Sequence, residues 1–340
     1  MKLSLTVLTV SCFTAVTAWA GTYSFQTINN PGDPNFNQLL GINNEGTIAG
    51  YFGDSVVVPN NGYTWNKTTG FVAENFPGAA QTQVVAINNI GVSPPVGPAM
   101  YNTAGFYVDN AGANHGFTNT LGTFATVDNP ATNSTPPFNQ LLALNDHNAA
   151  VGIYQDSASN FHGYEVNLTN NTFTAITLPS SFNATSVMAA GINNGGWISG
   201  NYTDSAGITN GFVDEGGTFK SFDDPNGNGT NTSFFGLNNN GLVVGSFVDA
   251  NGNNGLVYNL VTNTWQTVND PNQSFTSAFG VSGTFINGIN DAGDLVGFYS
   301  DGVHVNGMLA APTPEPASLG FILLGGLLVV GVSLKKRHTA

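Results

Sequence analysis

The chain has 340 residues, and only 8% of them are charged, with 20 acidic residues against 6 lysines and arginines. Four of the basic residues lie in the two terminal segments, so the body is strongly acidic, which excludes nucleic acid and anionic lipid as partners. The hydrophobic content of 41% excludes a disordered acidic chain. The one cysteine, Cys12, lies in the N-terminal apolar segment, which excludes disulfides, a thiol nucleophile and a cysteine metal site from the body.

The N-terminus has the parts of a secretory signal peptide over residues 1–20. Lys2 precedes an apolar stretch, and Ala18-Trp19-Ala20 forms an A-x-A cleavage site. We therefore expect cleavage between Ala20 and Gly21. Lipid attachment at Cys12 is an alternative, although Thr9 stands where a lipobox has Leu.

The C-terminus combines a short motif, an apolar run over residues 319–334 and a basic tail. The motif and the tail consist of Pro314, Glu315, Pro316, Lys335, Lys336 and Arg337. The apolar run predicts a short transmembrane helix. The basic cluster after it places the tail inside and the body outside. A plain C-terminal membrane anchor would have this pattern.

The order of these three parts also resembles a PEP-CTERM sorting signal, which would cover residues 312–340. The resemblance implies a Gram-negative bacterium that produces exopolysaccharide. It also implies that an exosortase in the inner membrane cuts near Pro314–Pro316 and passes the body to the cell surface or the medium. Exosortase is thus an expected processing partner, and the membrane is expected to hold the chain transiently.

One unit recurs six times between the two ends. Each copy has Gly or Ala, then Ile or Leu, then an anchoring Asn, at Asn43, Asn88, Asn145, Asn193, Asn238 and Asn290. The anchors are 45 to 57 residues apart, a period typical of propeller blades. In five copies a Gly follows the anchor by seven residues, but in the second copy this Gly comes ten residues later. The extra stretch holds Pro94, Pro95 and Pro98, so we expect an insertion into the turn or a strand.

Each repeat contains four strand-like segments. The first ends at the anchor, a Gly-containing turn leads to the second, an Asn-Gly or His-Gly pair opens the third, and the fourth ends in Pro where it has one. The sixth repeat stops after its third strand at 307–310, while residues 23–31 form a fourth strand with no repeat before it. We therefore predict an all-β, six-bladed β-propeller of four-stranded blades over residues 21–311, closed by the N-terminal strand. An open β-sandwich array or a β-solenoid is the alternative.

These repeats resemble the HAF-type extracellular repeat. The resemblance rests on the Gly/Ala-Ile/Leu-Asn-x-x-Gly turn and on the His-Gly-Phe segment that begins at His115. It covers roughly residues 21–310 and brings no catalytic residues with it.

Every repeat has an aromatic residue two positions after the motif Gly, at Phe52, Tyr107, Tyr154, Tyr202, Phe247 and Tyr299. Alternate residues of a strand share a face, so the aromatic ring and the Gly lie on one side. We expect packing between blades, with the Gly letting adjacent sheets approach. A platform of aromatic rings for sugars is the functional alternative.

Every repeat also has an Asp four positions after the motif Gly, at Asp54, Asp109, Asp156, Asp204, Asp249 and Asp301. We expect each carboxylate to accept hydrogen bonds within the loop that it opens, with Asp109–His115 and Asp156–His162 as loop clamps. The functional alternative is a rim of carboxylates for cations or polar ligands. A Ca²⁺ loop at Asp249, Asn251 and Asn253 is a weaker candidate, because the order of Gly and acidic residues departs from an EF-hand. No other metal or cofactor is expected.

No catalytic constellation stands out in the repeats. We therefore expect a non-enzymatic, secreted or surface-displayed propeller that binds or organises exopolysaccharide or another envelope protein. The alternative is a carbohydrate-active propeller enzyme, which needs two differently tuned carboxylates in one cleft. The second repeat, with its insertion, is the clear break in symmetry where such a cleft could form.

Overall fold

The strands of this chain form where short apolar segments alternate with Gly and Asn turns. The computed structural model describes residues 22–93, 97–227 and 231–313. The predicted signal peptide (1–20) and all but the first two residues of the predicted sorting signal (312–340) lie outside the described residues and remain predictions; Pro312 belongs to the last strand. Among the residues that are described, no helix has the length and apolar character needed to cross a membrane.

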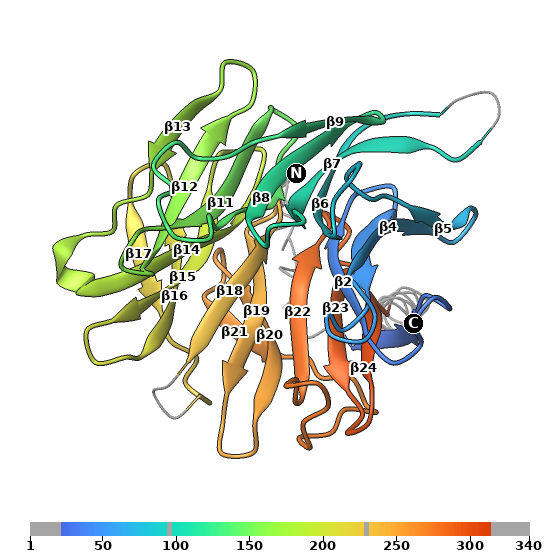
Figure 1. Ribbon diagram of the computed structural model, residues 1–340. Coiled ribbons are helices and arrows are strands. Elements are labelled where there is room, and N and C mark those ends of the chain that lie inside the picture. The colour runs from blue at the N-terminus through green and yellow to red at the C-terminus, as the bar shows by residue number, and fades with distance from the viewer. Residues whose placement is uncertain (1–21, 94–96, 228–230, 314–340) are drawn as a thin grey trace, which may run out of the picture. The chain divides into compact units, whose positions relative to one another are not determined.

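Residues Tyr23–Pro312 form one unit of six four-stranded antiparallel sheets, which we call blades 1 to 6 (Figure 1). Blade 1 consists of β2 (Asn37–Ile42), β3 (Ile48–Phe52), β4 (Asn61–Asn66) and β5 (Gly70–Ala73). Blade 2 consists of β6 (Gln81–Val92), β7 (Met100–Val108), β8 (Asn114–Thr120) and β9 (Thr123–Thr126). Blade 3 consists of β10 (Asn139–Leu144), β11 (Ala149–Gln155), β12 (Phe161–Asn167) and β13 (Thr172–Ala175). Blade 4 consists of β14 (Ala184–Ile192), β15 (Ile198–Asp204), β16 (Thr209–Asp214) and β17 (Phe219–Phe222). Blade 5 consists of β18 (Thr232–Leu237), β19 (Leu242–Val248), β20 (Asn253–Asn259) and β21 (Thr264–Thr267). Blade 6 consists of β22 (Thr284–Ile289), β23 (Leu295–Ser300) and β24 (Val305–Pro312), together with β1 (Tyr23–Thr27). A short 3₁₀ helix, η1 (Ser180–Phe182), precedes blade 4.

The ring closes through the two ends of the unit. In blade 6 the strand order is β22-β23-β24-β1, and Tyr23 pairs with Pro312 while Thr27 pairs with Met308. The innermost strand of blade 1, β2, contacts the innermost strands of both blade 2 and blade 6. The six-bladed propeller with N-terminal closure is therefore confirmed, and the open sandwich and solenoid alternatives are excluded.

The hydrophobic core lies between blades, with at least one cluster for each neighbouring pair and two between blades 6 and 1. Between blades 6 and 1, for example, Val296 and Ile28 pack with Leu39 and Ile48. Clusters of the same kind join the other five pairs. Because each blade buries both faces, no single blade could keep its apolar side chains from water alone.

The motif Gly of each repeat has a role different from the one predicted. It lies opposite a β-bulge in the innermost strand of its own blade, such as the register shift between Phe234 and Gly236 facing Gly245. A Cβ on Gly245 would lie closer than 3.0 Å to the carbonyl oxygen of Ser233. The motif Gly thus makes room for the bulge within a blade. The Gly that opens the third strand meets the next blade instead, as Gly211 meets Phe234.

The proline-rich insertion lengthens the first hairpin of blade 2. Strands β6 and β7 extend well beyond their counterparts, and the pairs Gly91–Tyr101 and Val92–Met100 continue the ladder. In Figure 1 this hairpin projects from the ring. Ile90, Val92 and Met100 are exposed on it. An insertion at this position was expected, and the structure shows that it extends both strands.

Candidate functional site

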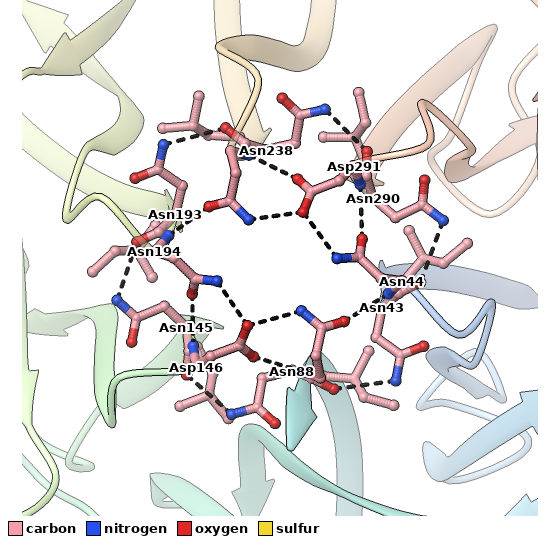
Figure 2. A pocket seen from close by; sticks show the side chains of 18 residues that line it. Asn43, Asn44, Asn88, Asn145, Asp146, Asn193, Asn194, Asn238, Asn290 and Asp291 are labelled. Carbon is pink, nitrogen blue, oxygen red and sulfur yellow. Dashed lines mark hydrogen bonds between the residues drawn. The ribbon is translucent and has the colours of Figure 1, made fainter. Parts of the chain in front are cut away.

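The anchoring asparagines form a closed ring of hydrogen bonds around the propeller axis (Figure 2). We call the end of the blades that carries them, where first and second strands are joined, the turn face. The amide nitrogen of each anchor donates to the backbone carbonyl oxygen of the anchor in the next blade, at 3.0–3.3 Å. The sixth bond, from Asn290 to Asn43, closes the circle. Each anchor oxygen also accepts from its own turn, as Asn193 does from Trp197 N at 2.9 Å. One amide therefore holds a turn and ties it to the next blade.

The residues after the anchors form a second closed ring. Each backbone N–H donates to the side-chain oxygen of the next member, at 2.7–2.9 Å, through Asn44, Asn89, Asp146, Asn194, Asn239 and Asp291. We call these six residues the axial ring. Sequence analysis assigned them to hairpin turns and missed the ring. The signal was present, because this position is Asn or Asp in all six repeats, which a turn alone does not require.

The two acidic members of the axial ring occupy its third and sixth places and so lie across the axis from each other. Asp146 Oδ2 accepts from the amides of Asn89 and Asn194 at 2.9 and 2.7 Å. Asp291 Oδ2 accepts from Asn44 and Asn239, both at 2.8 Å. Burial raises the pKa of the Asp291 carboxyl, but these two amides outweigh it and hold the pKa below its usual value.

The space inside this ring is small. A cavity of about 80 Å³ lies between the six side chains, and one of about 70 Å³ follows at the level of the innermost strands, where Ile42, Leu144 and Leu237 line it. Such volumes hold a few water molecules. The arrangement suits a clasp that keeps the blades in a circle, with the charge of each Asp neutralised by amide donors.

Replacing Asp291 by Asn is expected to lower the free energy of unfolding by about 2–3 kcal/mol at neutral pH, because two amide donors lose an ionised acceptor and face a third amide. The measurement is urea unfolding of both proteins as a function of pH. The pKa of Asp291 is lower in the folded protein than its value of about 3.9 in the unfolded chain. The ionised carboxylate therefore stabilises the fold fully above about pH 3.9, and this stabilisation is lost as the pH falls through the folded pKa. The difference between the two proteins should therefore shrink below about pH 4.

The control for this variant is Asp214→Asn at the end of β16. Asp214 Oδ1 accepts from Gly217 N at 2.6 Å, and an Asn side chain keeps that oxygen. It should change stability by less than about 0.5 kcal/mol. Equal losses in the two variants, or a difference that does not depend on pH, would show that the clasp does not depend on the carboxylate.

The six predicted loop aspartates lie at the opposite end of the blades, the loop face, where second and third strands are joined. Each carboxylate accepts backbone N–H groups of its own loop, as expected. Asp54 Oδ1, for example, accepts from Val56, Val57 and Val58 at 2.7–3.0 Å. The N–H groups of Val58 and Val57 hold the pKa of this carboxyl below its usual value.

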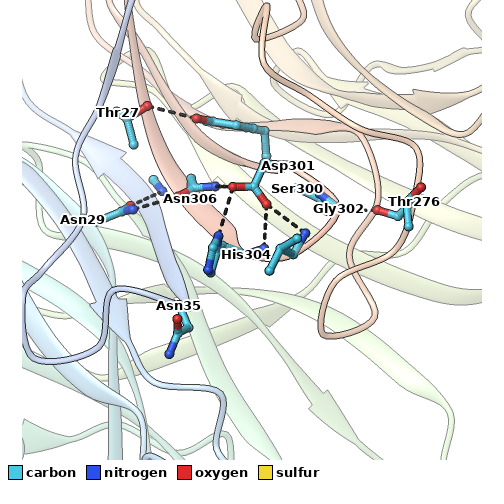
Figure 3. A network of polar contacts seen from close by, with 12 residues as sticks. Thr27, Asn29, Asn35, Thr276, Ser300, Asp301, Gly302, His304 and Asn306 are labelled. Carbon is cyan, nitrogen blue, oxygen red and sulfur yellow. Dashed lines mark hydrogen bonds and ion pairs between the residues drawn. The ribbon is translucent and has the colours of Figure 1, made fainter.

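Histidines join three of these loops. His162 Nε2 lies 2.9 Å from Asp156 Oδ2, which is the expected clamp. In blade 6, Asp301 Oδ2 contacts both His304 and Asn306 (Figure 3). The third histidine, His115, departs from the predicted pairing with Asp109.

In blade 2, His115 binds the segment that follows β9 more closely than it binds its own loop. His115 Nδ1 lies 2.6 Å from Asp128 Oδ2, whereas its Nε2 lies 3.6 Å from Asp109 Oδ2. The histidine therefore links the loop to the segment that follows the fourth strand.

The loop carboxylates do not converge on a metal site in the described residues, where no group of three or more His, Cys, Asp or Glu side chains has a suitable arrangement. In the candidate Ca²⁺ loop, Asp249 Oδ1 accepts from the N–H groups of Asn251 and Gly252. The Asn253 amide lies 3.4 Å from Ser282 Oγ. A ligand-binding rim and a Ca²⁺ loop at these residues stay predictions.

The repeated aromatic residues pack against the connections between blades. Tyr107 stacks on Phe76 with ring centres 3.9 Å apart, and Tyr202 stacks on Phe182 at 5.2 Å. Phe76 and Phe182 both belong to the segment that leads in from the preceding blade. The packing interpretation is confirmed for these rings.

A groove of about 690 Å³ lies between blades 2 and 3 on the turn face. Its lining is entirely uncharged and rich in hydroxyls and amides, including Asn102, Thr118, Thr120, Asn148 and Thr169. Asn102 is 9% exposed, and its Oδ1 accepts no hydrogen bond from any described residue. A buried acceptor without a donor costs free energy that a ligand hydroxyl or a water can recover. Sequence analysis missed this groove, because its two walls come from different repeats.

Comparison with known proteins gives the fold class. No protein-family model matches the chain, and no curated protein matches it. Among solved structures, a TolB protein of Agrobacterium tumefaciens superposes with a TM-score of 0.51 at 14% identity, over 83% of this chain and 92% of that one. TolB of Acinetobacter baumannii gives 0.47 at 12%, over 82% and 63%. A lectin of Aleuria aurantia, described as a six-bladed β-propeller that recognises fucose, gives 0.46 at 12%, over 82% and 96%. At these identities the likeness is to the propeller fold.

Proposed function

We propose that this chain is a secreted or surface-displayed propeller that binds exopolysaccharide in the groove between blades 2 and 3 without chemically changing it. The observation that carries the proposal is the uncharged lining of that groove with its unpartnered acceptor, Asn102 Oδ1. Sugar hydroxyls are donors and acceptors at once, so a wall of threonine hydroxyls and asparagine amides can pair with them. Export and exosortase processing belong to the same proposal and rest on the two terminal segments.

Asn102→Ala tests the proposal with a single side chain. We expect affinity for a bound glycan to fall about tenfold, because one buried hydrogen bond to the ligand is lost. Stability should not fall, because the deleted oxygen has no partner among the described residues. The measurement is a glycan array followed by titration calorimetry on the full-length protein, with thermal unfolding beside it.

The matched control is Asn61→Ala on the loop face of blade 1, where the side chain donates to Pro59 O at 2.8 Å. Its glycan affinity should equal that of the unmodified protein. Loss of affinity in both variants would remove the groove as the site. Release of reducing sugar from the bound glycan would replace the binding function by the enzymatic alternative.

A further inference from the structure

A second cavity lies on the other side of blade 2, between this blade and blade 1, with a volume of about 230 Å³. Its walls include Glu74 from the end of β5, Asn119 and Phe124 from blade 2, and Met100 and Tyr101 from the extended hairpin. The two cavities flank blade 2. Asn102 and Thr103 both line the groove toward blade 3, and the Thr103 hydroxyl also donates to Glu74.

The lengthened hairpin adds a second aromatic ring to this cavity, beside Phe124. Tyr101 pairs with Gly91 in the lengthened hairpin. A Cβ at Gly91 would lie closer than 3.0 Å to the Tyr101 ring, so the glycine lets the ring lie across the strand. The other blades have no counterpart of this hairpin among their described residues. Among the described residues, the wall that Met100 and Tyr101 supply is therefore specific to blade 2.

Glu74 brings a carboxylate into this apolar and aromatic surrounding. It accepts from Asn119 Nδ2 at 2.9 Å and from Thr103, which are both neutral. No ion pair between described residues includes it. Burial raises the pKa of the Glu74 carboxyl, and the two donors only partly offset this. A cation in the cavity would supply the missing compensation.

We infer that this cavity binds the protonated amino group of an amino sugar, so that the glycan of the proposed function carries free amines. A carboxylate beside aromatic rings is the surrounding that recognises an alkylammonium group, through a charge-assisted hydrogen bond and the ring faces. The net negative charge of the body also favours a cationic ligand. Residues 22–313 contain every acidic residue except Glu315 but only two lysines, Lys67 and Lys220, so a polycationic glycan is attracted to the surface.

This inference rests on the proposed function, and the test separates the two. Titration calorimetry on the full-length protein compares a glucosamine oligomer with an N-acetylglucosamine oligomer of the same length, below the pKa of the amine. The free-amine oligomer should bind about tenfold more tightly, and added salt should reduce the preference. Glu74→Gln should abolish the preference, whereas Asn102→Ala should weaken both oligomers by the same factor. Glu45→Gln, an exposed carboxylate in a turn of blade 1, controls for the loss of one charge and should keep the preference.

The remaining outcomes of this experiment distinguish the amino-sugar inference from glycan binding in general. Equal binding of both oligomers to the unmodified protein overturns the amino-sugar inference and leaves glycan binding intact. Binding of neither oligomer overturns both. A lysine tripeptide that binds through Glu74 as tightly as the amino sugar shows a site for basic peptide instead. Circular dichroism checks that Glu74→Gln is folded, and Phe124→Leu, which keeps the carboxylate, should lose part of the preference by itself.

Discussion

Gly245→Ala is expected to destabilise the propeller by more than about 3 kcal/mol or to prevent folding. The added methyl group would press on the carbonyl oxygen of Ser233 across the bulge of the innermost strand. That oxygen belongs to a paired backbone, so it cannot move without breaking the ladder between β18 and β19. The measurement is urea unfolding followed by fluorescence of the tryptophans.

Gly196→Ala is the control for Gly245→Ala. Gly196 has a φ of +75°, and no atom lies within 4 Å of the position of an added Cβ. Left-handed backbone alone should therefore cost about 1 kcal/mol. A loss at Gly245 no larger than this would mean that the bulge adapts, and it would remove the structural reason for the motif Gly.

The motif Gly shows how far the sequence could lead. The constant spacing of seven residues from Asn193 to Gly200 predicted two strands joined by a turn, and this is what forms. The reason for the Gly was not accessible. The bulge between Ala189 and Gly191 shifts the register by one residue, and no local pattern of side chains reports such a shift. The glycine was therefore assigned to packing between blades, although Met188 O of its own blade is what it faces.

The axial ring was accessible only in part. The sequence shows that its position is Asn or Asp in every repeat, but not which groups these side chains bind. Asn44 N donates to Asn89 Oδ1, 45 residues along the chain, and Asp291 N donates back to Asn44 Oδ1 across 247 residues. Only the closed ring brings the six turns to one axis. The alternation of two Asp with four Asn then becomes meaningful, because every carboxylate lies between two amide donors.

The cavities beside blade 2 could be predicted only in part. The proline-rich insertion predicted where the symmetry breaks. It did not predict that Glu74, from the preceding repeat, would meet Thr103 and Asn119 there. A site between two blades draws its residues from two repeats, and their meeting depends on how the ring closes.

Deleting residues 23–30 is expected to abolish the folded unit, at a cost on the order of the whole stability of a domain, about 5–15 kcal/mol. The deletion removes β1, which pairs with β24 along its full length. It also removes Ile28, which is 4% exposed, and Asn29, whose Oδ1 accepts from Gly307 N at 3.0 Å. The bare edge of β24 would then be free to pair with other chains. Size-exclusion chromatography and thermal unfolding should show aggregates and no cooperative transition.

A peptide of residues 23–31 added in trans should restore a cooperative transition whose midpoint rises with peptide concentration, because the peptide binds only the folded ring. The matched control is the same peptide with Phe25→Asp and Ile28→Asp, which keeps the backbone donors but places charges against the apolar cluster of blade 6 and against Leu39. This control peptide should not restore the cooperative transition. If the shortened chain unfolds at the original midpoint, the N-terminal strand does not close the ring, and the clasp of amides and carboxylates at the axis holds the six blades by itself.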